Sequence, residues 1–413
     1  MIWNYERQPY TRAVLSGENV EPYTALELTQ SAMRSAASLQ LWRTQDFHRN
    51  RPIVSFLDPL VVPFLCTAIM SPRSIRVSLL VAAALVVTAY ADGSPKRTFA
   101  FITHEDQGYN YYNWSRITDI GFWHMPHDDI LKLASQHNVK LWQDSNLPDS
   151  KTWTDDSKVD QWVQEKVKQV QSGKLTGGVF FDYEGQEWSA DIKKAYTKLA
   201  KKTSEALKSL NASVFVCVGG RPSYELRDFD YKGLGEHSEF LFIMGYDMHF
   251  WDDYTCVTKG TCSPANAGIK DLTDGVNAYL KDVPADKLVL GLPWYGIRYQ
   301  VIVVPWNRGQ VQYSDILTAM NDKHRFKSLN YDHPSQSWVL TCNGDCIHDK
   351  TGGTIWFDDA KSLTPKYKLA KDNDLLGVGC WEISYLPLPD DKGNDPNQKE
   401  RNDMLNAFVN WYD

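Results

Sequence analysis

The sequence of 413 residues has no excess of positively charged residues and no nucleotide-binding motif after a predicted strand. Its formal net charge is −7 with the acidic residues spread along the chain, so nothing indicates nucleic acid or an anionic membrane as a partner. No G-x-G-x-x-G follows a predicted strand, so nothing favours a dinucleotide-binding fold. Aromatic residues, in contrast, make up 13% of the chain. Such rings can form a core or stack against the flat face of a ligand such as a sugar.

Residues 70–91 have the pattern of a secretory signal peptide that is displaced from the N-terminus. Two arginines precede an apolar stretch, and Ala89-Tyr90-Ala91 matches an A-x-A cleavage site. The apolar stretch is shorter than the roughly 20 residues that a membrane-spanning helix needs. We therefore expect a mature chain that begins near Asp92, with residues 1–69 as a non-native or disordered extension. The alternative is a cytosolic tail followed by a signal anchor.

The cysteines fit an oxidising compartment. Six of the seven follow the predicted cleavage site, namely Cys217, Cys256, Cys262, Cys342, Cys346 and Cys380. Cys256/Cys262 and Cys342/Cys346 each close a short polar loop, and both pairs are predicted to be disulfides; four thiolates around zinc are the alternative. The other two lie in apolar strand runs and are predicted to be core residues. Two glycosylation sequons, at 113–115 and 211–213, agree with secretion.

Eight short apolar runs have the composition of buried strands. They are Thr98–Thr103, Asp119–Trp123, Val139–Asp144, Gly178–Glu184, Ser213–Gly219, Phe240–Asp247, Leu288–Tyr295 and Gly377–Glu382. Helix candidates between or after them are Ser157–Gln171, Trp188–Leu210, Asp271–Lys281, Ser362–Asn373 and Gln398–Trp411. Eight alternating units favour a closed barrel over an open sheet. The sequence thus predicts an α/β fold, a (β/α)₈ TIM barrel over residues 92–413, with a small β-rich insertion at Gln300–Asp358 between strands seven and eight.

The fourth of these runs, GGVFFDYE at residues 177–184, ends in two carboxylates. Side chains on a strand alternate faces, so Phe180, Asp182 and Glu184 point one way and Tyr183 points the other way. Two acids therefore share one face at the C-terminal tip of a strand, where α/β barrels place their chemistry. The alternative is an ordinary core strand that runs into a solvated loop.

Aromatic and acidic residues also stand at three other strand tips. Strand six ends in Met244-Gly245-Tyr246-Asp247, strand seven in Pro293-Trp294-Tyr295-Gly296, and strand eight in Trp381-Glu382. Each of these three segments, taken alone, is explained more simply as a strand end, a cluster at the barrel rim or a core residue. Their occurrence together at successive strand tips favours a functional site. His124 and His127 have H-x-x-H spacing, yet no third ligand is evident on any tip. They are predicted to be loop residues, and neither a metal nor a cofactor is expected.

In this order the tips resemble the family 18 glycoside hydrolases, and within them the chitobiase branch. The resemblance runs from about Thr98 to the C-terminus. Four segments carry it: DYE at 182–184, FLFIMGYD at 240–247, LVLGLPWYG at 288–296 and GVGCW at 377–381. The first segment alone is a weak signal, whereas all four at matching strand positions are specific.

The resemblance implies retaining hydrolysis of β-1,4-linked N-acetylglucosamine, assisted by the acetamido group of the substrate. Glu184 would act as the general acid and later as the base towards water, Asp182 would hold the acetamido N–H, and Tyr246 would bind the acetamido oxygen. Residues expected to bind the sugar are Trp381 as the floor, with Asp247, Trp294, Tyr295 and Met244 around it. The implied substrates are chitooligosaccharides or the chitobiose core of N-glycans.

Two departures from the family pattern concern the strand-four motif D-x-x-D-x-D-x-E. Its first two acids are replaced by Gly177 and Phe180. The first replacement is expected to alter a turn. The second removes a charged neighbour of Asp182 and adds an apolar one, which disfavours a charged carboxyl group, so an acid-leaning pH profile is expected. The small-residue S-x-G-G of strand three is also absent, with Leu141-Trp142-Gln143-Asp144 in that region, and this bulkier strand is expected to narrow the cleft.

Several alternatives stay open. A catalytically silent glycan-binding lectin on the same barrel is the first, although the terminal acid Glu184 is present; an endo-chitinase is the second, and an unrelated barrel protein is the third. No separate chitin-binding module and no long aromatic ladder is evident, which favours a short pocket and exo-action. We expect a secreted or lysosomal monomer without a stable membrane association.

Overall fold

The computed structural model describes residues 95–103, 108–172, 174–185, 189–222, 228–248, 264–301, 305–343 and 353–413. The predicted extension at 1–69, the signal peptide at 70–91 and the mature start near Asp92 lie outside the described residues. So do three cysteines of the predicted disulfides, Cys256, Cys262 and Cys346. Cys342, the predicted partner of Cys346, is disulfide-bonded. Cys217 and Cys380 are buried core residues, as predicted.

Eight parallel strands close into a barrel in the order β1-β13-β7-β6-β5-β4-β3-β2. Their bounds are β1 Arg97–Ile102, β2 Asp119–Phe122, β3 Lys140–Asp144, β4 Gly178–Phe181, β5 Ser213–Gly219, β6 Leu241–Met244, β7 Leu288–Pro293 and β13 Gly377–Trp381. Each predicted strand overlaps one barrel strand, and the predicted TIM barrel is confirmed. Strands β4 and β6 end before the residues predicted to react, which places those residues in the segments that follow the strands.

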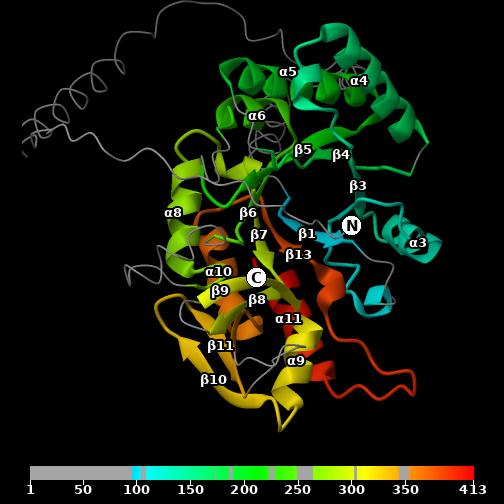
Figure 1. The fold of residues 1–413 in the computed structure, drawn as a ribbon. Coiled ribbons are helices and arrows are strands. Elements are labelled where there is room, and N and C mark those ends of the chain that lie inside the picture. The colour runs from blue at the N-terminus through cyan, green and yellow to red at the C-terminus, as the bar shows by residue number, and fades with distance from the viewer. Residues whose placement is uncertain are drawn as a thin grey trace, which may run out of the picture. The chain divides into compact units, whose positions relative to one another are not determined.

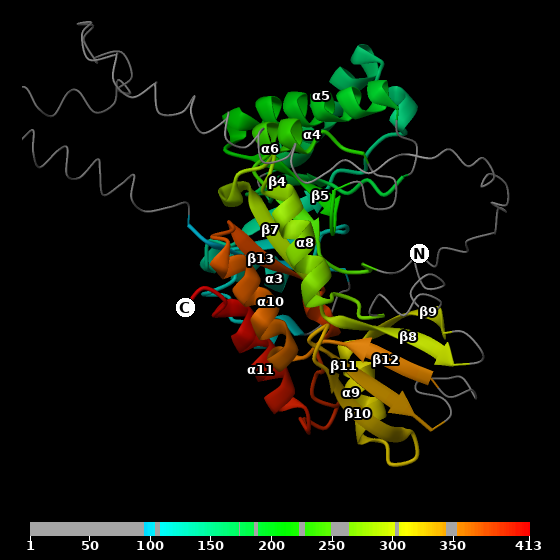
Figure 2. The same ribbon diagram turned by 90° about the vertical axis from the view of Figure 1, so that its left-hand side faces the viewer.

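The helices lie outside the barrel (Figure 1). They are α3 Asp128–Gln136, α4 Asp156–Gln171, α5 Ala190–Leu207, α6 Tyr231–His237, α8 Ile269–Tyr279, α9 Tyr313–Asn321, α10 Ala360–Asp372 and α11 Gln398–Val409. Figures 1 and 2 show α4, α5 and α6 together beside β4 and β5, and α10 packs against β7 and β13. The sequence predicted the longer helices and missed α3, α6 and α9, which have at most nine residues. None of the described helices is long and apolar enough to cross a membrane.

Aromatic rings fill the interior of the barrel. The alternation predicted for β4 is confirmed, because Phe180 packs in the interior cluster while Phe181 packs in the layer between the strands and the helices. The ring of Phe180 stacks on Phe215 at 5.0 Å, and Phe215 stacks on Phe240 at 4.7 Å. Inward-facing side chains of parallel barrel strands form such layers, so the barrel is a packed core beneath its C-terminal rim.

Charged residues close the opposite, N-terminal end of the barrel. Arg97 donates to Asp119 Oδ1 at 2.7 Å and also to Glu239 Oε1. The Trp142 indole donates to the same Asp119 oxygen at 2.8 Å. These bonds tie strands β1, β2 and β3 together at the end remote from the strand tips.

Five further strands follow β7 in sequence and precede β13. They form a sheet in the order β10-β11-β12-β8-β9, with bounds β8 Tyr295–Val301, β9 Pro305–Gln312, β10 Phe326–Asp332, β11 Ser337–Cys342 and β12 Gly353–Phe357. The sheet begins at Tyr295, so the expected start at Gln300 is wrong by five residues: the pairing of Tyr295 with β9 begins directly after the barrel strand. Figure 2 shows the sheet beside the barrel with α9 packed on it.

A buried ion pair ties this sheet to the barrel helices. Lys366 of α10 donates to Asp358 Oδ1 at 2.5 Å and to Ser337 Oγ at 2.9 Å. Both charged side chains are fully buried. Removing one partner of such a pair leaves an uncompensated charge, so the pair fixes the sheet against α10.

Candidate active site

The strand tips enclose one cavity at the C-terminal end of the barrel. Six of the predicted site residues line it: Asp182, Glu184, Met244, Tyr246, Asp247 and Trp381. The remaining lining residues are Phe101, Cys217, Gly219, Gly220 and Gln310. Side chains more than 60 residues apart in sequence thus meet at one place, as expected for the C-terminal tips of barrel strands.

The two acids occupy different environments. Asp182 is half-buried, with its Oδ1 atom shielded from solvent, and Glu184 is exposed. Both lie on the side of β4 that continues from the interior residue Phe180, while Tyr183 packs outward against Trp153 with ring centroids 4.8 Å apart. The acids therefore share one face of the segment, and Glu184 is the one that can meet solvent or a departing group.

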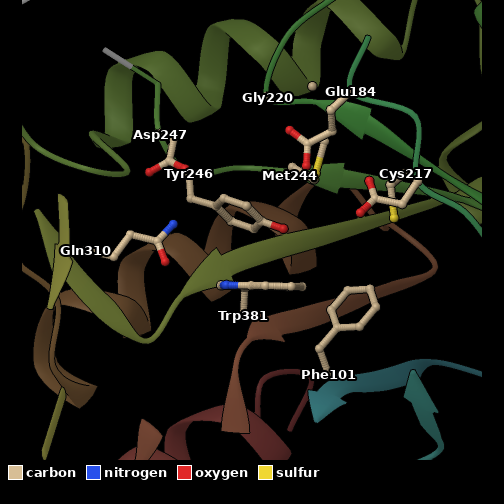
Figure 3. A pocket seen from close by; sticks show the side chains of 11 residues that line it. Phe101, Glu184, Cys217, Gly220, Met244, Tyr246, Asp247, Gln310 and Trp381 are labelled. Atoms are coloured by element: carbon tan, nitrogen blue, oxygen red, sulfur yellow. The ribbon is translucent and has the colours of Figure 1, made fainter. Parts of the chain in front are cut away.

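Tyr246 and Trp381 form the aromatic part of the cavity. Their ring centroids lie 6.3 Å apart, and the Trp381 ring is seen edge-on in Figure 3, with Tyr246 and Glu184 above it and Phe101 below it. Burial, followed by the charges of Cys217, Asp182 and Glu184, raises the pKa of Tyr246 well above its ordinary value. The Tyr246 hydroxyl is therefore protonated at any physiological pH and available as a hydrogen-bond donor.

Other aromatic rings hold Trp381 in place from beneath. Phe101 and Trp123 contact it with ring centroids 5.3 Å and 5.1 Å away. Its carbonyl oxygen accepts a hydrogen bond from the Trp294 N–H at 2.7 Å. The peptide bond between Trp381 and Glu382 is cis. Glu382 itself is fully buried and accepts hydrogen bonds from Thr103, so it links the ends of β13 and β1 and does not line the cavity.

Asp247 is fixed from two sides. The Tyr295 hydroxyl donates to Asp247 Oδ1 at 2.8 Å, and the Asp247 N–H donates to Asn266 Oδ1 at 2.7 Å. Asn266 in turn donates to the Tyr295 carbonyl at 3.2 Å. Asp247 has a left-handed backbone with φ of 52°, a conformation that Asp tolerates better than most residues. Tyr295 therefore does not line the cavity itself but orients the cavity residue Asp247 through this hydrogen bond.

The prediction that Trp294 lines the pocket is wrong. Its indole is fully buried on the outer side of the barrel, where it contacts Phe408 with ring centroids 5.2 Å apart and donates to the Tyr367 hydroxyl at 3.1 Å. Successive residues of an extended chain point to opposite faces. Since Tyr295 faces inward, its neighbour Trp294 must face the helices. The sequence-based prediction was wrong because it placed both side chains in the pocket.

Two expectations about the family departures are also wrong. Gly177 does not alter a turn: its N–H and carbonyl pair with Leu141 and Ser213 of the neighbouring strands. Its missing side chain makes room for Trp142, because a Cβ at this position would lie 2.3 Å from Trp142 Cε2. Trp142 is fully buried in the barrel interior, and none of residues 141–144 lines the cavity with the acids, so this strand does not narrow the cleft.

Some cavity residues escaped sequence reasoning. Phe101 and Cys217 could have been found, since they share the inward parity of Phe99 and Phe215 on β1 and β5. Gly219 has the same parity and ends β5, and Gly220 directly follows the strand. Gln310 and Asn266 carried no signal, because Gln310 reaches the cavity from the five-stranded sheet and Asn266 contacts Asp247 from a loop outside the cavity.

Metal binding finds no support among the described residues, which contain no group of three or more His, Cys, Asp or Glu side chains in metal-binding proximity. The imidazole of His127 accepts a hydrogen bond from the Asp129 N–H at 3.3 Å and caps helix α3. His124 is exposed. The cavity groups themselves, three carboxyl side chains, a protonated phenol and an indole platform, can donate a proton and hold a planar ligand.

Comparison with known proteins gives one family. A model of the glycosyl hydrolases family 18 matches residues 105–385. Probable di-N-acetylchitobiase 1 of Dictyostelium discoideum is 29% identical over 323 residues, which cover 71% of this chain and 84% of that protein.

Solved structures with the same fold include two plant proteins. A class V chitinase from Nicotiana tobaccum has a TM-score of 0.58 at 14% identity, covering 77% of this chain and 99% of that one. The chitinase-like agglutinin RobpsCRA from Robinia pseudoacacia has a TM-score of 0.58 at 14% identity, covering 76% and 99%. At this identity the likeness concerns the fold alone.

Proposed function

Because the chain belongs to the glycosyl hydrolases family 18 and is a glycosidase, we propose that it removes N-acetylglucosamine by exo-action from short β-1,4-linked oligosaccharides. The substrates would be chitooligosaccharides or the chitobiose core of N-glycans. The observation that carries the proposal is the meeting of Asp182, Glu184, Tyr246 and Trp381 in one cavity. The similarity to a probable di-N-acetylchitobiase supports short substrates.

In the first half of the reaction, Glu184 would donate its proton to the glycosidic oxygen. The bond between the anomeric carbon and that oxygen breaks, and the carbonyl oxygen of the substrate's own acetamido group forms a bond to the anomeric carbon. The product is an oxazolinium ion and a free sugar hydroxyl. This substrate-assisted course is a known exception to the two-carboxylate scheme. The exposed position of Glu184 supports its role, because the departing sugar leaves towards solvent.

Asp182 and Tyr246 would position the acetamido group. The half-buried carboxylate of Asp182 would accept a hydrogen bond from the acetamido N–H and stabilise the positive charge of the ring. The protonated hydroxyl of Tyr246 is a donor for the acetamido oxygen, and the bond would orient this oxygen towards the anomeric carbon. Trp381 would carry the sugar ring on its face.

In the second half, Glu184 would take a proton from water. The water oxygen forms the bond to the anomeric carbon, the oxazolinium ring opens, and the acetamido group is restored. Two inversions at one carbon give net retention.

Hydrolysis of a fluorogenic di-N-acetylchitobioside by the chain from Asp92 onward tests the proposal, beside Glu184→Gln. We expect turnover in the parent, highest below neutral pH, and a loss of about 10³-fold or more in the variant. Single-sugar release from chitotetraose separates exo-action from the endo-chitinase alternative. An optimum above neutrality would contradict the effect expected of Phe180, and turnover by Glu184→Gln would exclude Glu184 as the acid.

The second candidate is a lectin that binds chitooligosaccharides without cleaving them. The fold likeness to a chitinase-like agglutinin is the observation in its favour. Binding of chitotetraose by both parent and Glu184→Gln, with no product from either, would establish it.

A further inference from the structure

One face of the five-stranded sheet continues from the cavity. Gln310 of β9 lines the cavity and is exposed. Residues directly opposite one another on neighbouring antiparallel strands share a face. Gln310 pairs with Ile297, Ile297 with Trp356, and Trp356 with Val339. These residues therefore form a row that crosses four strands and starts at the cavity.

Trp356 is the aromatic member of this row. It is half-buried, and it rests on the same cluster of Tyr295, Ile297 and Tyr299 as the cavity residues Tyr246 and Trp381. No ring among the described residues pairs with the Trp356 indole, although Trp381 and Tyr246 contact each other. Four aromatic side chains thus pack against this cluster: Tyr246 and Trp381 line the cavity, whereas Trp356 and Tyr385 do not.

Hydroxyl side chains lie on the same face, two residues from Trp356 along the strand. Thr354 lies two residues away on β12 and pairs with Tyr299 on one side and Thr341 on the other, and Thr341 pairs with Ser328. Thr354, Thr341 and Ser328 are all partly exposed. An aromatic face flanked by hydroxyl groups suits a sugar ring, which offers C–H groups to the indole and hydroxyl groups at its edge.

We propose that Trp356 is a sugar-stacking residue that binds a ring of the oligosaccharide beyond the disaccharide held at the cavity. Adjacent strands lie ~4.8 Å apart, so Trp356 stands two strands, or roughly 10 Å, from Gln310. This spacing places it past the sugars that contact Trp381 and Gln310. The inference rests on the proposed function for the identity of its ligand, and it makes the enzyme prefer longer chitooligosaccharides over the disaccharide.

Calorimetric titration with two ligands, di-N-acetylchitobiose and chitotetraose, tests the proposal. The proteins are Glu184→Gln, which prevents cleavage, and the same chain with Trp356→Ala added. We expect the added change to raise the Kd of chitotetraose about tenfold and to leave the Kd of the disaccharide unchanged. Trp356→Phe keeps a planar ring and should restore part of the affinity.

Trp338 provides the matched control. It is a tryptophan of the same sheet on the opposite face, where it pairs with Phe357 of β12 and contacts Lys361. Trp338→Ala should change the affinity for neither ligand, with folding of each variant verified by circular dichroism.

The outcomes separate this inference from the proposed function. Equal loss for both ligands, or no loss for chitotetraose, would overturn the role of Trp356 even in an active enzyme. A selective loss for chitotetraose would support it even if the parent with intact Glu184 proved inactive on every substrate. Failure of all proteins to bind either ligand would overturn it as well.

Discussion

Gly177 and Trp142 fit each other across strands β4 and β3. A Cβ built on Gly177 would lie 2.3 Å from Cε2 and 2.5 Å from Cδ2 of the Trp142 indole. Real carbon atoms do not approach so closely, so the absent side chain at one position and the large side chain at the other belong together. The loss of the first motif acid at Gly177 and the large Trp142 in strand three are thus one repacking of the barrel interior, away from the cavity.

Gly177→Ala is expected to lower the free energy of unfolding by about 2 kcal/mol, because the methyl group overpacks a filled interior. Chemical denaturation measures it. The same substitution in a Trp142→Phe background should cost about 1 kcal/mol less, since the smaller ring leaves space. Strictly additive effects would show that the two positions do not interact.

Tyr246→Phe is expected to lower kcat about 10²-fold, because it removes the donor for the acetamido oxygen. Burial and then the neighbouring charges raise the pKa of Tyr246, so the hydroxyl stays protonated through the alkaline range. The ratio of parent to variant rates should therefore be constant with pH, which a pH–rate profile measures. Tyr299→Phe is the control: its hydroxyl donates to the Pro264 carbonyl at 2.9 Å outside the cavity, and its kcat should match the parent. A ratio that falls towards one in alkali would indicate that Tyr246 ionises.

Trp381→Phe and Trp294→Phe should have opposite consequences. The first shrinks the platform in the cavity, so kcat/KM should fall about tenfold with little loss of stability. The second removes the bond to Tyr367 and the contact with Phe408 outside the barrel, so it should cost about 2 kcal/mol of stability and leave kcat/KM unchanged. Steady-state kinetics and thermal unfolding of both variants test these expectations. A change in KM for Trp294→Phe would indicate that Trp294 contacts the substrate after all.

Glu239→Gln is expected to reduce stability in a pH-dependent way. Burial acts to raise the pKa of Glu239, but the charges of Arg97 and Lys140 outweigh it, and the pKa in the folded state is lowered. A lowered folded-state pKa contributes stability above the unfolded value of about 4.3, and this contribution is lost as the pH falls through the folded value.

Urea unfolding should therefore show a cost of about 1 kcal/mol near neutrality that disappears in acid, below the folded-state pKa of Glu239. Asp274→Asn, which breaks the exposed pair with Lys270, is the control and should have no measurable effect at either pH. A cost that persists in acid would assign the effect to packing instead of charge.

The sequence alone determined the barrel and most of its rim. Short continuous apolar runs located all eight barrel strands, because a strand that is buried on both faces has apolar residues at successive positions. The parity of β4 correctly placed Phe180, Asp182 and Glu184 on one side, since alternation is a local property of extended backbone. The short helices α3, α6 and α9 were missed because few residues carry their periodicity.

Tertiary structure decided what depends on a partner from elsewhere in the chain. From the sequence, Trp294 and Tyr295 are both predicted to be aromatic residues of the pocket. The structure distinguishes them, because Trp294 packs on Phe408 outside the barrel and the Tyr295 hydroxyl donates a hydrogen bond to Asp247. Gln310 reaches the cavity only because the five-stranded sheet folds beside the barrel. The absence of a side chain at Gly177 is explained only by the Trp142 indole, which fills the space that a Cβ would occupy. Local geometry fixes which way a side chain points, whereas what it meets depends on contacts between distant segments, which no local pattern encodes.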